Sequence, residues 1–213
     1  MLSGKHYIAG EWLDGPDVFQ ADNPSTGDKL PTKFQHGTEE LVDQAVSAAQ
    51  ACAEEFAAML PAKRAGFLRA IADEIDASGD EITEIGNLES ALPAARLTGE
   101  RGRTVGQLRF FADWIEEGSW LEARIETAQP DRQPLPKPDI RVMHKALGPV
   151  GVFGASNFPL AFSVAERNQL PRSRNCSPTT VNPIGRSSWL SIWYCCITLV
   201  CARLGPDNCG RCW

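Results

Sequence analysis

Apolar and polar positions alternate over the first residues and then recur at helical spacing. Tyr7–Leu13 places β-forming residues around a glycine, and the turn-forming pair Asp14-Gly15 follows, which predicts strands that end at a hairpin turn. Asn23–Gly27 is a second cluster of turn-forming residues. The chain is therefore expected to begin with short strands and tight turns.

Helical spacing begins at Thr38, whose hydroxyl can accept a backbone N–H and so cap a helix. Apolar residues then recur three and four positions apart, at Leu41, Ala45, Ala48, Cys52, Phe56 and Met59. Pro61 ends this helix and opens a second one, which Ser78-Gly79 closes. Ser78 and Glu81 have the spacing of a capping box, so we expect them to start a third helix.

Pro93 opens a fourth predicted helix, and Gly118 is a plausible C-cap. Its inward positions are predicted to be Leu97, Val105, Leu108, Phe111 and Ile115. Asp131–Arg141 contains three prolines, which excludes a helix and predicts an extended connector. Ile140–Lys145 then alternates like a strand, and Leu147–Phe153 is typical of a buried strand that enters a turn.

The composition changes abruptly near residue 166. Residues 1–165 hold 15 basic and 25 acidic residues, a formal charge of −10, whereas residues 166–213 hold six Arg, no Lys and two acidic residues, a charge of +4. Six of the seven Cys and three of the six Trp also lie in this second part. The two parts are therefore expected to have different origins.

Charge and hydropathy exclude several classes of protein. The net charge of −6 argues against a nucleic-acid partner, which needs a basic surface. Residues 1–10 contain no apolar segment typical of a secretory signal, so we expect a cytoplasmic protein. The longest apolar stretch, Trp189–Leu204, has 16 residues and is shorter than the roughly 18–20 of a spanning helix, so no membrane span is predicted.

The segment with the clearest chemical potential is Gly148–Pro159, where the predicted strand runs into Gly154-Ala155-Ser156-Asn157. Ligands of α/β proteins bind at the ends of such strands, and glycines let a ligand approach the backbone. The amide of Asn157 supplies two N–H donors of the kind that stabilise an oxyanion. The G-x-x-G-x-x-G spacing is not the dinucleotide fingerprint, so these residues alone also fit a strand followed by an ordinary turn.

Several stretches together resemble the aldehyde dehydrogenase family. Gly148–Pro159 is similar to the first strand of the family's cofactor domain, which a turn ending in Asn-Phe-Pro follows. Tyr7–Trp12 resembles its opening strand, Asn23–Gly27 its Asn-Pro-x-Thr-Gly turn, and Leu68–Asp73 its second helix. The resemblance runs through most of residues 5–165.

Further stretches point to a subgroup of that family, the 2,5-dioxovalerate (α-ketoglutarate semialdehyde) dehydrogenases. They are Gly99–Thr104, Gly118–Arg124, Pro130–Asp139 and Phe153–Ser163. The resemblance implies an NAD- or NADP-dependent oxidoreductase that converts an aldehyde into a carboxylic acid. It also implies a homo-oligomer.

The fold implied by the resemblance is α/β and incomplete. Residues 1–145 would form the N-terminal strands and helices of a Rossmann-like cofactor domain, residues 146–165 its first cofactor-binding strand and turn, and residues 166–213 a Cys-, Arg- and Trp-rich tail outside the family. The parallel sheet would then lack most of its strands. We therefore expect apolar helix faces such as Leu97–Ile115 to be left without a partner.

In enzymes of this family a cysteine thiolate attacks the aldehyde, hydride passes to the nicotinamide, and a glutamate-activated water hydrolyses the thioester. The resemblance assigns Asn157 the catalytic role of holding the oxyanion. It places the backbone of Phe153, Gly154, Ala155, Ser156 and Asn157 along the cofactor.

The chain departs from the family at two places. Ser90-Ala91 replaces the usual Thr-Gly at the end of a helix, which looks like ordinary drift. After Ala165 the family's small residues and glycine give way to Glu166–Pro171, and no lysine follows Lys145. The family's nucleophilic cysteine and general-base glutamate have no counterpart here, so we expect a truncated, inactive chain with an out-of-frame tail.

Two other functions stay open. The chain could instead be a binding or assembly fragment that joins full-length homologues. Alternatively, Cys209-Gly210-Arg211-Cys212 has the C-x-x-C spacing of thiol-metal sites, and Cys195, Cys196 and Cys201 could complete the ligands. No scaffold to fix such ligands is apparent around them, so no metal site is predicted.

Overall fold

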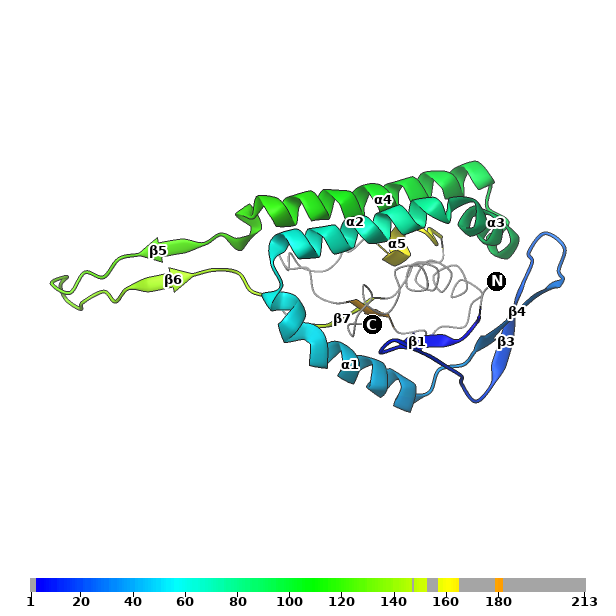
Figure 1. Ribbon diagram of the computed structural model, residues 1–213, viewed down its shortest axis with the longest axis horizontal. Helices are drawn as coiled ribbons and strands as arrows, with labels where there is room; N and C mark the ends of the chain where they lie inside the picture. Colours follow the sequence, from blue (N-terminus) through cyan, green and yellow to red (C-terminus); the bar gives the residue numbers. More distant parts are fainter. Residues whose placement is uncertain (1–2, 147, 153–156, 165–178, 182–213) are drawn as a thin grey trace.

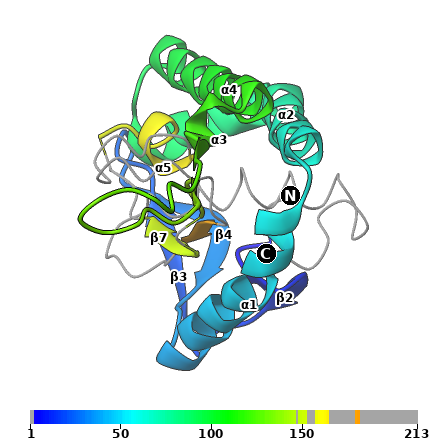
Figure 2. The same ribbon diagram turned by 90° about the vertical axis from the view of Figure 1, so that its left-hand side faces the viewer.

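A computed structural model describes residues 3–146, 148–152, 157–164 and 179–181. Its helices are α1 (Glu39–Ala58), α2 (Pro61–Ala77), α3 (Gly79–Ser90), α4 (Ala94–Glu117), the short α5 (Ala161–Val164) and a 3-10 turn, η1 (Ser119–Leu121). Its strands are β1 (His6–Ile8), β2 (Glu11–Leu13), β3 (Val18–Asp22), β4 (Lys29–Gln35), β5 (Arg124–Glu126), β6 (Ile140–Val142), β7 (Val150–Val152) and β8 (Thr179–Val181). Helices α2, α3 and α4 form one layer, and α1 lies with the N-terminal strands on the opposite side of the molecule (Figures 1 and 2).

The first hairpin turns earlier than the sequence predicted. Strands β1 and β2 pair antiparallel around Ala9 and Gly10, whose φ angles are 54° and 88°. Two consecutive positive φ values give the turn that matches the twist of a tight hairpin. The prediction of a hairpin turn at Asp14-Gly15 was therefore wrong, and these two residues connect β2 to β3 instead.

The second turn lies where it was predicted. Asn23–Gly27 joins β3 to β4, which pair antiparallel. The carbonyl of Asn23 accepts the N–H of Gly27 at 2.8 Å, and its side-chain oxygen accepts the N–H of Ser25 at 2.9 Å. This side-chain bond is the reason that asparagine suits the first position of a turn.

The structure confirms the predicted helix cap at Thr38 and contradicts the one predicted at Ser78. The Thr38 hydroxyl accepts the N–H of Leu41 at 3.3 Å, as predicted for the start of α1. At the start of α3, by contrast, the Ser78 side chain makes no capping hydrogen bond. Its φ and ψ of −94° and 11° are not extended, and its own N–H still bonds to the Glu74 carbonyl of α2. The capping box with Glu81 is therefore absent, because α3 follows α2 without the extended residue that such a cap needs.

Helix α4 buries the face that was expected to be uncovered. Its Leu97, Val105 and Leu108 form one apolar cluster, with Leu97 fully buried. The other members come from α2, α3 and the segment before α5, namely Ala72, Ile75, Ile82 and Leu160. The expectation that Leu97–Ile115 lacks a partner was wrong, because neighbouring helices of the same chain cover this face. Ile115 is buried as well, whereas Phe111 is only half-buried.

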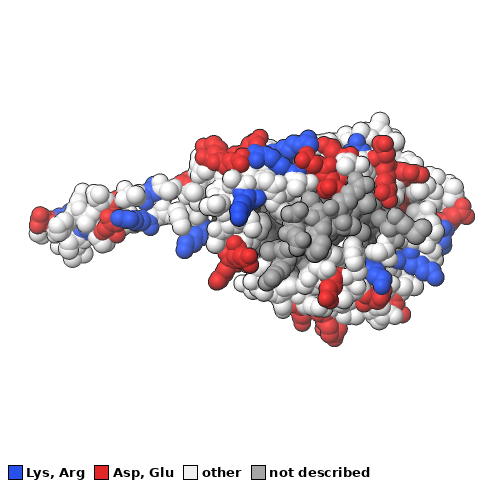
Figure 3. Space-filling view, viewed as in Figure 1, with Lys and Arg blue, Asp and Glu red and all other residues white. Residues whose placement is uncertain are grey.

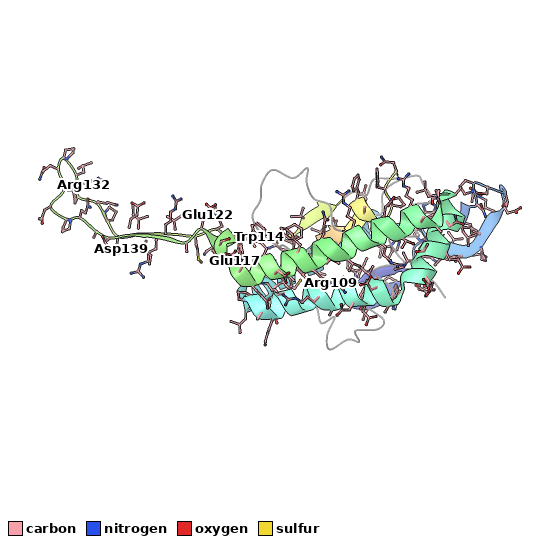
Figure 4. The ribbon with its side chains drawn as sticks, turned by 90° about the horizontal axis from the view of Figure 1, so that it is seen from above. Arg109, Trp114, Glu117, Glu122, Arg132 and Asp139 are labelled. Atoms are coloured by element: carbon pink, nitrogen blue, oxygen red, sulfur yellow. The ribbon has the colours of Figure 1, made fainter. Side chains whose placement is uncertain are left out.

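Strands β5 and β6 form a two-stranded arm that projects from the body of the molecule (Figure 1). Arg132 lies near its tip and Glu122 at its root (Figure 4). Asp131–Arg141 was predicted to be a connector, and the structure shows instead that it forms the outer part of this arm and its return strand. The Lys137 amine pairs with the Glu126 carboxylate at 2.7 Å across the arm, which lowers the pKa of Glu126.

A parallel strand pair lies between the two layers (Figures 1 and 2). The strand predicted at Leu147–Phe153 appears as β7, and Gly151 pairs with Thr180 of β8. The sequence did not predict this partner strand within residues 166–213. With helices and small sheets, the chain has the fold of an incomplete α/β, Rossmann-like domain. Across the described ranges, no helix has both the length and the apolar character needed to cross a bilayer.

Candidate functional site

Asn157 is the one predicted site residue that the structure describes, and it lies in the turn before α5. Asn157 is described and exposed, whereas Phe153, Gly154, Ala155 and Ser156 lie outside the described residues. Among the described residues, no group forms a hydrogen bond with the side-chain amide of Asn157.

The guanidinium of Arg96, on α4, holds the start of this turn. It donates a hydrogen bond to the backbone carbonyl of Asn157 and stacks over the ring of Phe158, 4.6 Å from the ring centroid. Its Nε donates to Oε1 of Glu100 at 3.0 Å. The Arg96 guanidinium therefore bridges the Glu100 carboxylate and the Asn157 carbonyl.

The carboxylate of Glu100 holds the other end of the turn. Its Oε2 accepts the backbone N–H groups of Leu160 at 3.1 Å and Ala161 at 3.4 Å. The Thr104 hydroxyl donates to the Leu160 carbonyl at 2.8 Å. Glu100 and Thr104 are only 5% and 2% exposed, so these bonds are shielded from competing water.

Aromatic and apolar contacts complete the turn. The rings of Phe158 and Phe162 stack with their centroids 4.5 Å apart, and the Phe162 N–H bonds to the Phe158 carbonyl at 3.1 Å. The Leu160 side chain enters the core cluster of α2, α3 and α4. The turn is therefore fixed by its side chains as well as by its backbone.

Sequence reasoning missed the three residues of α4 that support the turn. Arg96, Glu100 and Thr104 recur every four residues and lie along one side of the helix. Glu100 and Thr104 fall between the inward positions Leu97 and Leu108, where the pattern requires apolar residues. Polar residues at inward positions are the signal that could have identified them, because buried polar groups need partners.

The departure at Ser90-Ala91 has a structural consequence. Ala91 caps the C-terminus of α3 with a φ of 55°, and its N–H bonds to the Asn87 carbonyl at 2.8 Å. This left-handed conformation costs about 1–2 kcal/mol for a residue with a Cβ and nothing comparable for glycine. Ala91 therefore carries a local backbone strain that a glycine at this position would not have.

Ion pairs cross between α2 and α4 away from the turn. Arg69 pairs with Asp113 and Glu116, and Arg109 pairs with Asp73 and Asp76. The Arg69 guanidinium lowers the pKa of Glu116 through a hydrogen bond. Acidic and basic side chains alternate along this edge (Figure 3), and Arg109 projects from α4 in Figure 4. The mixed signs are typical of a solvated helix surface and not of a binding site.

The described residues contain no group of three or more His, Cys, Asp or Glu side chains placed to hold a metal ion. Cys52 is buried in α1, where its thiol donates to the Ala49 carbonyl at 3.4 Å. The cysteines of the thiol-metal alternative lie outside the described residues, as do all six cysteines after residue 165.

Comparison with known proteins identifies the class to which this fold and turn belong. Residues 12–169 match the family model described as the aldehyde dehydrogenase family, and the chain belongs to that family. It is 48% identical over 166 residues to α-ketoglutaric semialdehyde dehydrogenase 2 of Azospirillum brasilense, covering 77% of this chain and 32% of that protein. It is 41% identical over 167 residues to α-ketoglutaric semialdehyde dehydrogenase of Acinetobacter baylyi, covering 76% and 31%.

Solved structures share the fold at lower identity. The betaine aldehyde dehydrogenase of Staphylococcus aureus, in complex with NAD+, has a TM-score of 0.77 at 18% identity and covers 96% of this chain and 39% of that chain. The NADP-dependent glyceraldehyde-3-phosphate dehydrogenase of Bacillus halodurans, complexed with NADP, has a TM-score of 0.76 at 19% identity and covers 96% and 42%. This chain spans about a third of the length of the two curated relatives.

Proposed function

We propose that this chain provides the N-terminal part of the cofactor domain of an NAD- or NADP-dependent dehydrogenase that oxidises 2,5-dioxovalerate to the dicarboxylic acid. The observation that carries the proposal is the turn after β7, which α4 holds at both ends while the Asn157 amide stays exposed. The similarity to two α-ketoglutaric semialdehyde dehydrogenases supports the substrate class.

Two features of the chain fit a dinucleotide at this turn. Strand β7 belongs to a parallel pair, and ligands of α/β proteins bind beyond the carboxyl ends of such strands. The segment from Phe153 to Asn157, which follows β7 directly, contains only small residues between its ends. When bound, NAD or NADP would accept the hydride that leaves the substrate.

Asn157 has a defined part in this proposal. Its amide N–H groups would donate to the carbonyl oxygen of the aldehyde as negative charge develops there, and such a donor contributes about 2.7–4 kcal/mol to an oxyanion site. The backbone of residues 153–157 would lie along the cofactor. The hydrogen bond from Arg96 to the Asn157 carbonyl would hold the amide in place during the reaction.

The 213-residue chain by itself is proposed to be inactive. The family match ends at residue 169, and residues 166–213 contain no lysine. By family resemblance, the nucleophilic cysteine and the general-base glutamate belong to later parts of the family's sequence, and residues 166–213 contain no counterpart of those parts. We propose that this tail arises from another reading frame, which sequencing the DNA across codons 150–220 and translating all three frames would test.

The experiment that tests the cofactor proposal is calorimetric titration of the whole chain with NAD+ and with NADP+. Saturable binding of one of them supports the cofactor site, and absence of binding at millimolar cofactor counts against it. NADH or NADPH production from 2,5-dioxovalerate is followed in parallel. Turnover by the chain alone would contradict the proposed inactivity.

The arm favours a second candidate function, assembly with a homologous chain. Apolar side chains are exposed along β5 and β6 and beside them, at Ile125, Leu135, Ile140, Val142 and Met143. Among the described residues, each of the two strands pairs only with the other. An exposed apolar strand edge is a surface on which another chain can pair.

Co-purification with the full-length Azospirillum brasilense relative tests this second function. The tagged chain is compared with an Ile125→Lys, Leu135→Lys variant, which places charges on the arm. A Val46→Lys variant is the matched control, because Val46 is also exposed but lies on α1. Loss of complex in the arm variant alone supports assembly, and equal recovery of all three chains contradicts it.

A further inference from the structure

We propose that Glu100 is a positioning residue for Asn157. Its buried carboxylate fixes the end of the turn directly and the start of the turn through Arg96, and so aims the exposed amide. The inference rests on the proposed function of Asn157 as the oxyanion donor. Glu100 itself would touch neither substrate nor cofactor.

The geometry places one carboxylate at the centre of the turn's support. Oε2 of Glu100 binds the N–H groups of Leu160 and Ala161, at the end of the turn. Oε1 binds Arg96, whose guanidinium reaches back to the carbonyl of Asn157, at the start of the turn. The carboxylate and the guanidinium therefore close a ring of hydrogen bonds around residues 157–161.

A carboxylate is the side chain that these contacts require. All three groups that face Glu100 are N–H donors, so both oxygens must accept. A glutamine in the same place would turn its own NH2 toward one set of donors and lose that set. Glu100 is 5% exposed, so water cannot take over the lost bonds, and an unpaired charge there would be strongly unfavourable.

Thr104 adds a second support of the same kind. Its hydroxyl donates to the Leu160 carbonyl at 2.8 Å, while Glu100 accepts the Leu160 N–H, so both polar groups of one peptide residue are held by α4. Hydrogen bonds to both the N–H and the carbonyl of Leu160 restrict the motion of the turn, which the positioning of the Asn157 side chain requires. The apolar cluster, by contrast, holds only the Leu160 side chain and does not orient the peptide groups.

Nuclear magnetic resonance of the whole nitrogen-15-labelled chain tests the inference with Glu100→Gln. Amide exchange at Leu160 and Ala161 should become at least about tenfold faster, because a hydrogen bond to a charged group contributes about 1.5–3 kcal/mol. Glu54→Gln removes one charge from an exposed position of α1 and should leave both rates unchanged. Unchanged exchange at both amides together with an unchanged order parameter of Asn157 would overturn the proposal, because the glutamine must turn its NH2 toward one of the two sets of donors.

A readout at Asn157 separates positioning from a general loss of stability. The backbone order parameter of Asn157 should fall from about 0.85 to below about 0.6 in Glu100→Gln, while that of α1 stays constant. Thr104→Val should lower it as well, and Thr104→Ser, which keeps the hydroxyl, should restore it. An Asn157 that remains rigid in Glu100→Gln would refute the positioning role even if the exchange rates rise.

Titration of the wild-type chain with NAD+ and NADP+ keeps the two proposals apart. Absence of binding would count against the proposed cofactor site, and the order parameter of Asn157 would still decide whether Glu100 positions the turn. Binding that weakens at least about tenfold in Glu100→Gln, with Glu54→Gln unchanged, would support both. Equal affinity of the wild type and Glu100→Gln would leave the cofactor site in place, and the order parameter of Asn157 would again decide whether Glu100 positions the turn.

Discussion

Substitution of Leu97 by Ala tests how α4 packs. Leu97 has no exposed surface and lies in the cluster shared by α2, α3, α4 and the segment before α5. The change removes three carbon atoms, which contribute about 0.8 kcal/mol each through burial, or roughly 2.4 kcal/mol. A residual cavity adds to this value, so the expected loss in the free energy of unfolding is about 2–5 kcal/mol.

The assay is urea unfolding of the whole chain, followed by far-ultraviolet circular dichroism. Phe110→Ala is the matched control, because Phe110 lies on the same helix and is 62% exposed, and it should change the free energy by no more than about 0.5 kcal/mol. If Leu97→Ala leaves too little folded chain to measure, Leu97→Met nearly conserves the volume and should lose less than about 1.5 kcal/mol.

The result that would refute this packing is a Leu97→Ala variant as stable as the Phe110→Ala control. That outcome would mean that α2 and α3 do not cover α4 in solution. The apolar face would then be unpartnered, as the sequence alone had led us to expect. A loss within the stated range, with an unchanged dependence on urea concentration, would confirm the cluster.

Three further predictions concern single positions. Gly15→Ala should lower the free energy of unfolding by roughly 1–3 kcal/mol in urea titrations, because a Cβ would lie 2.0 Å from the backbone oxygen of His36; unchanged stability would contradict this contact. Ala91→Gly should raise the free energy of unfolding by a net ~0.5–1 kcal/mol in urea titrations, since relief of the left-handed strain exceeds the added entropy of the unfolded chain; a lower free energy of unfolding would count against the strain. Burial lowers the pKa of His6 below its ordinary 6.5, so the unfolded chain takes up a proton at a higher pH than the folded chain. The free energy of unfolding should therefore fall as the pH drops below 6.5 and level off below the pKa of the folded state. A His6→Gln variant with the same pH dependence of stability would refute this.

Local signals predicted most of the elements. Thr38, Pro61, Pro93 and Gly118 mark helix ends within one residue of where the structure has them, because capping chemistry and the constraints of proline act within a few residues. The Asn23–Gly27 turn was predicted for the same reason. The pair Asp14-Gly15 shows the limit of such signals, since a favourable turn sequence does not decide which of two neighbouring turns closes a hairpin.

Likewise, only part of the candidate site was predicted from the sequence. Asn157 was singled out because its segment resembles the aldehyde dehydrogenases, and the family match confirms that relationship without testing the role of the residue. Glu100 was not identified, because its partners Leu160 and Ala161 lie 60 and 61 positions further along the chain. The sequence pattern does not show contacts between residues so far apart. The only sign of this contact in the sequence is a polar residue at an inward position of the helix.

The sequence by itself determined the periodic elements, the change in composition near residue 166 and the family resemblance, because each depends on residues close together in the chain or on a shared order of motifs. Only the tertiary structure decided which face of α4 is covered, that Asp131–Arg141 belongs to a projecting arm, and that one buried carboxylate ties the Asn157 turn to a distant helix. These features depend on how elements far apart in the chain pack together, and packing is set by shape and by the pairing of buried polar groups, which no local pattern records.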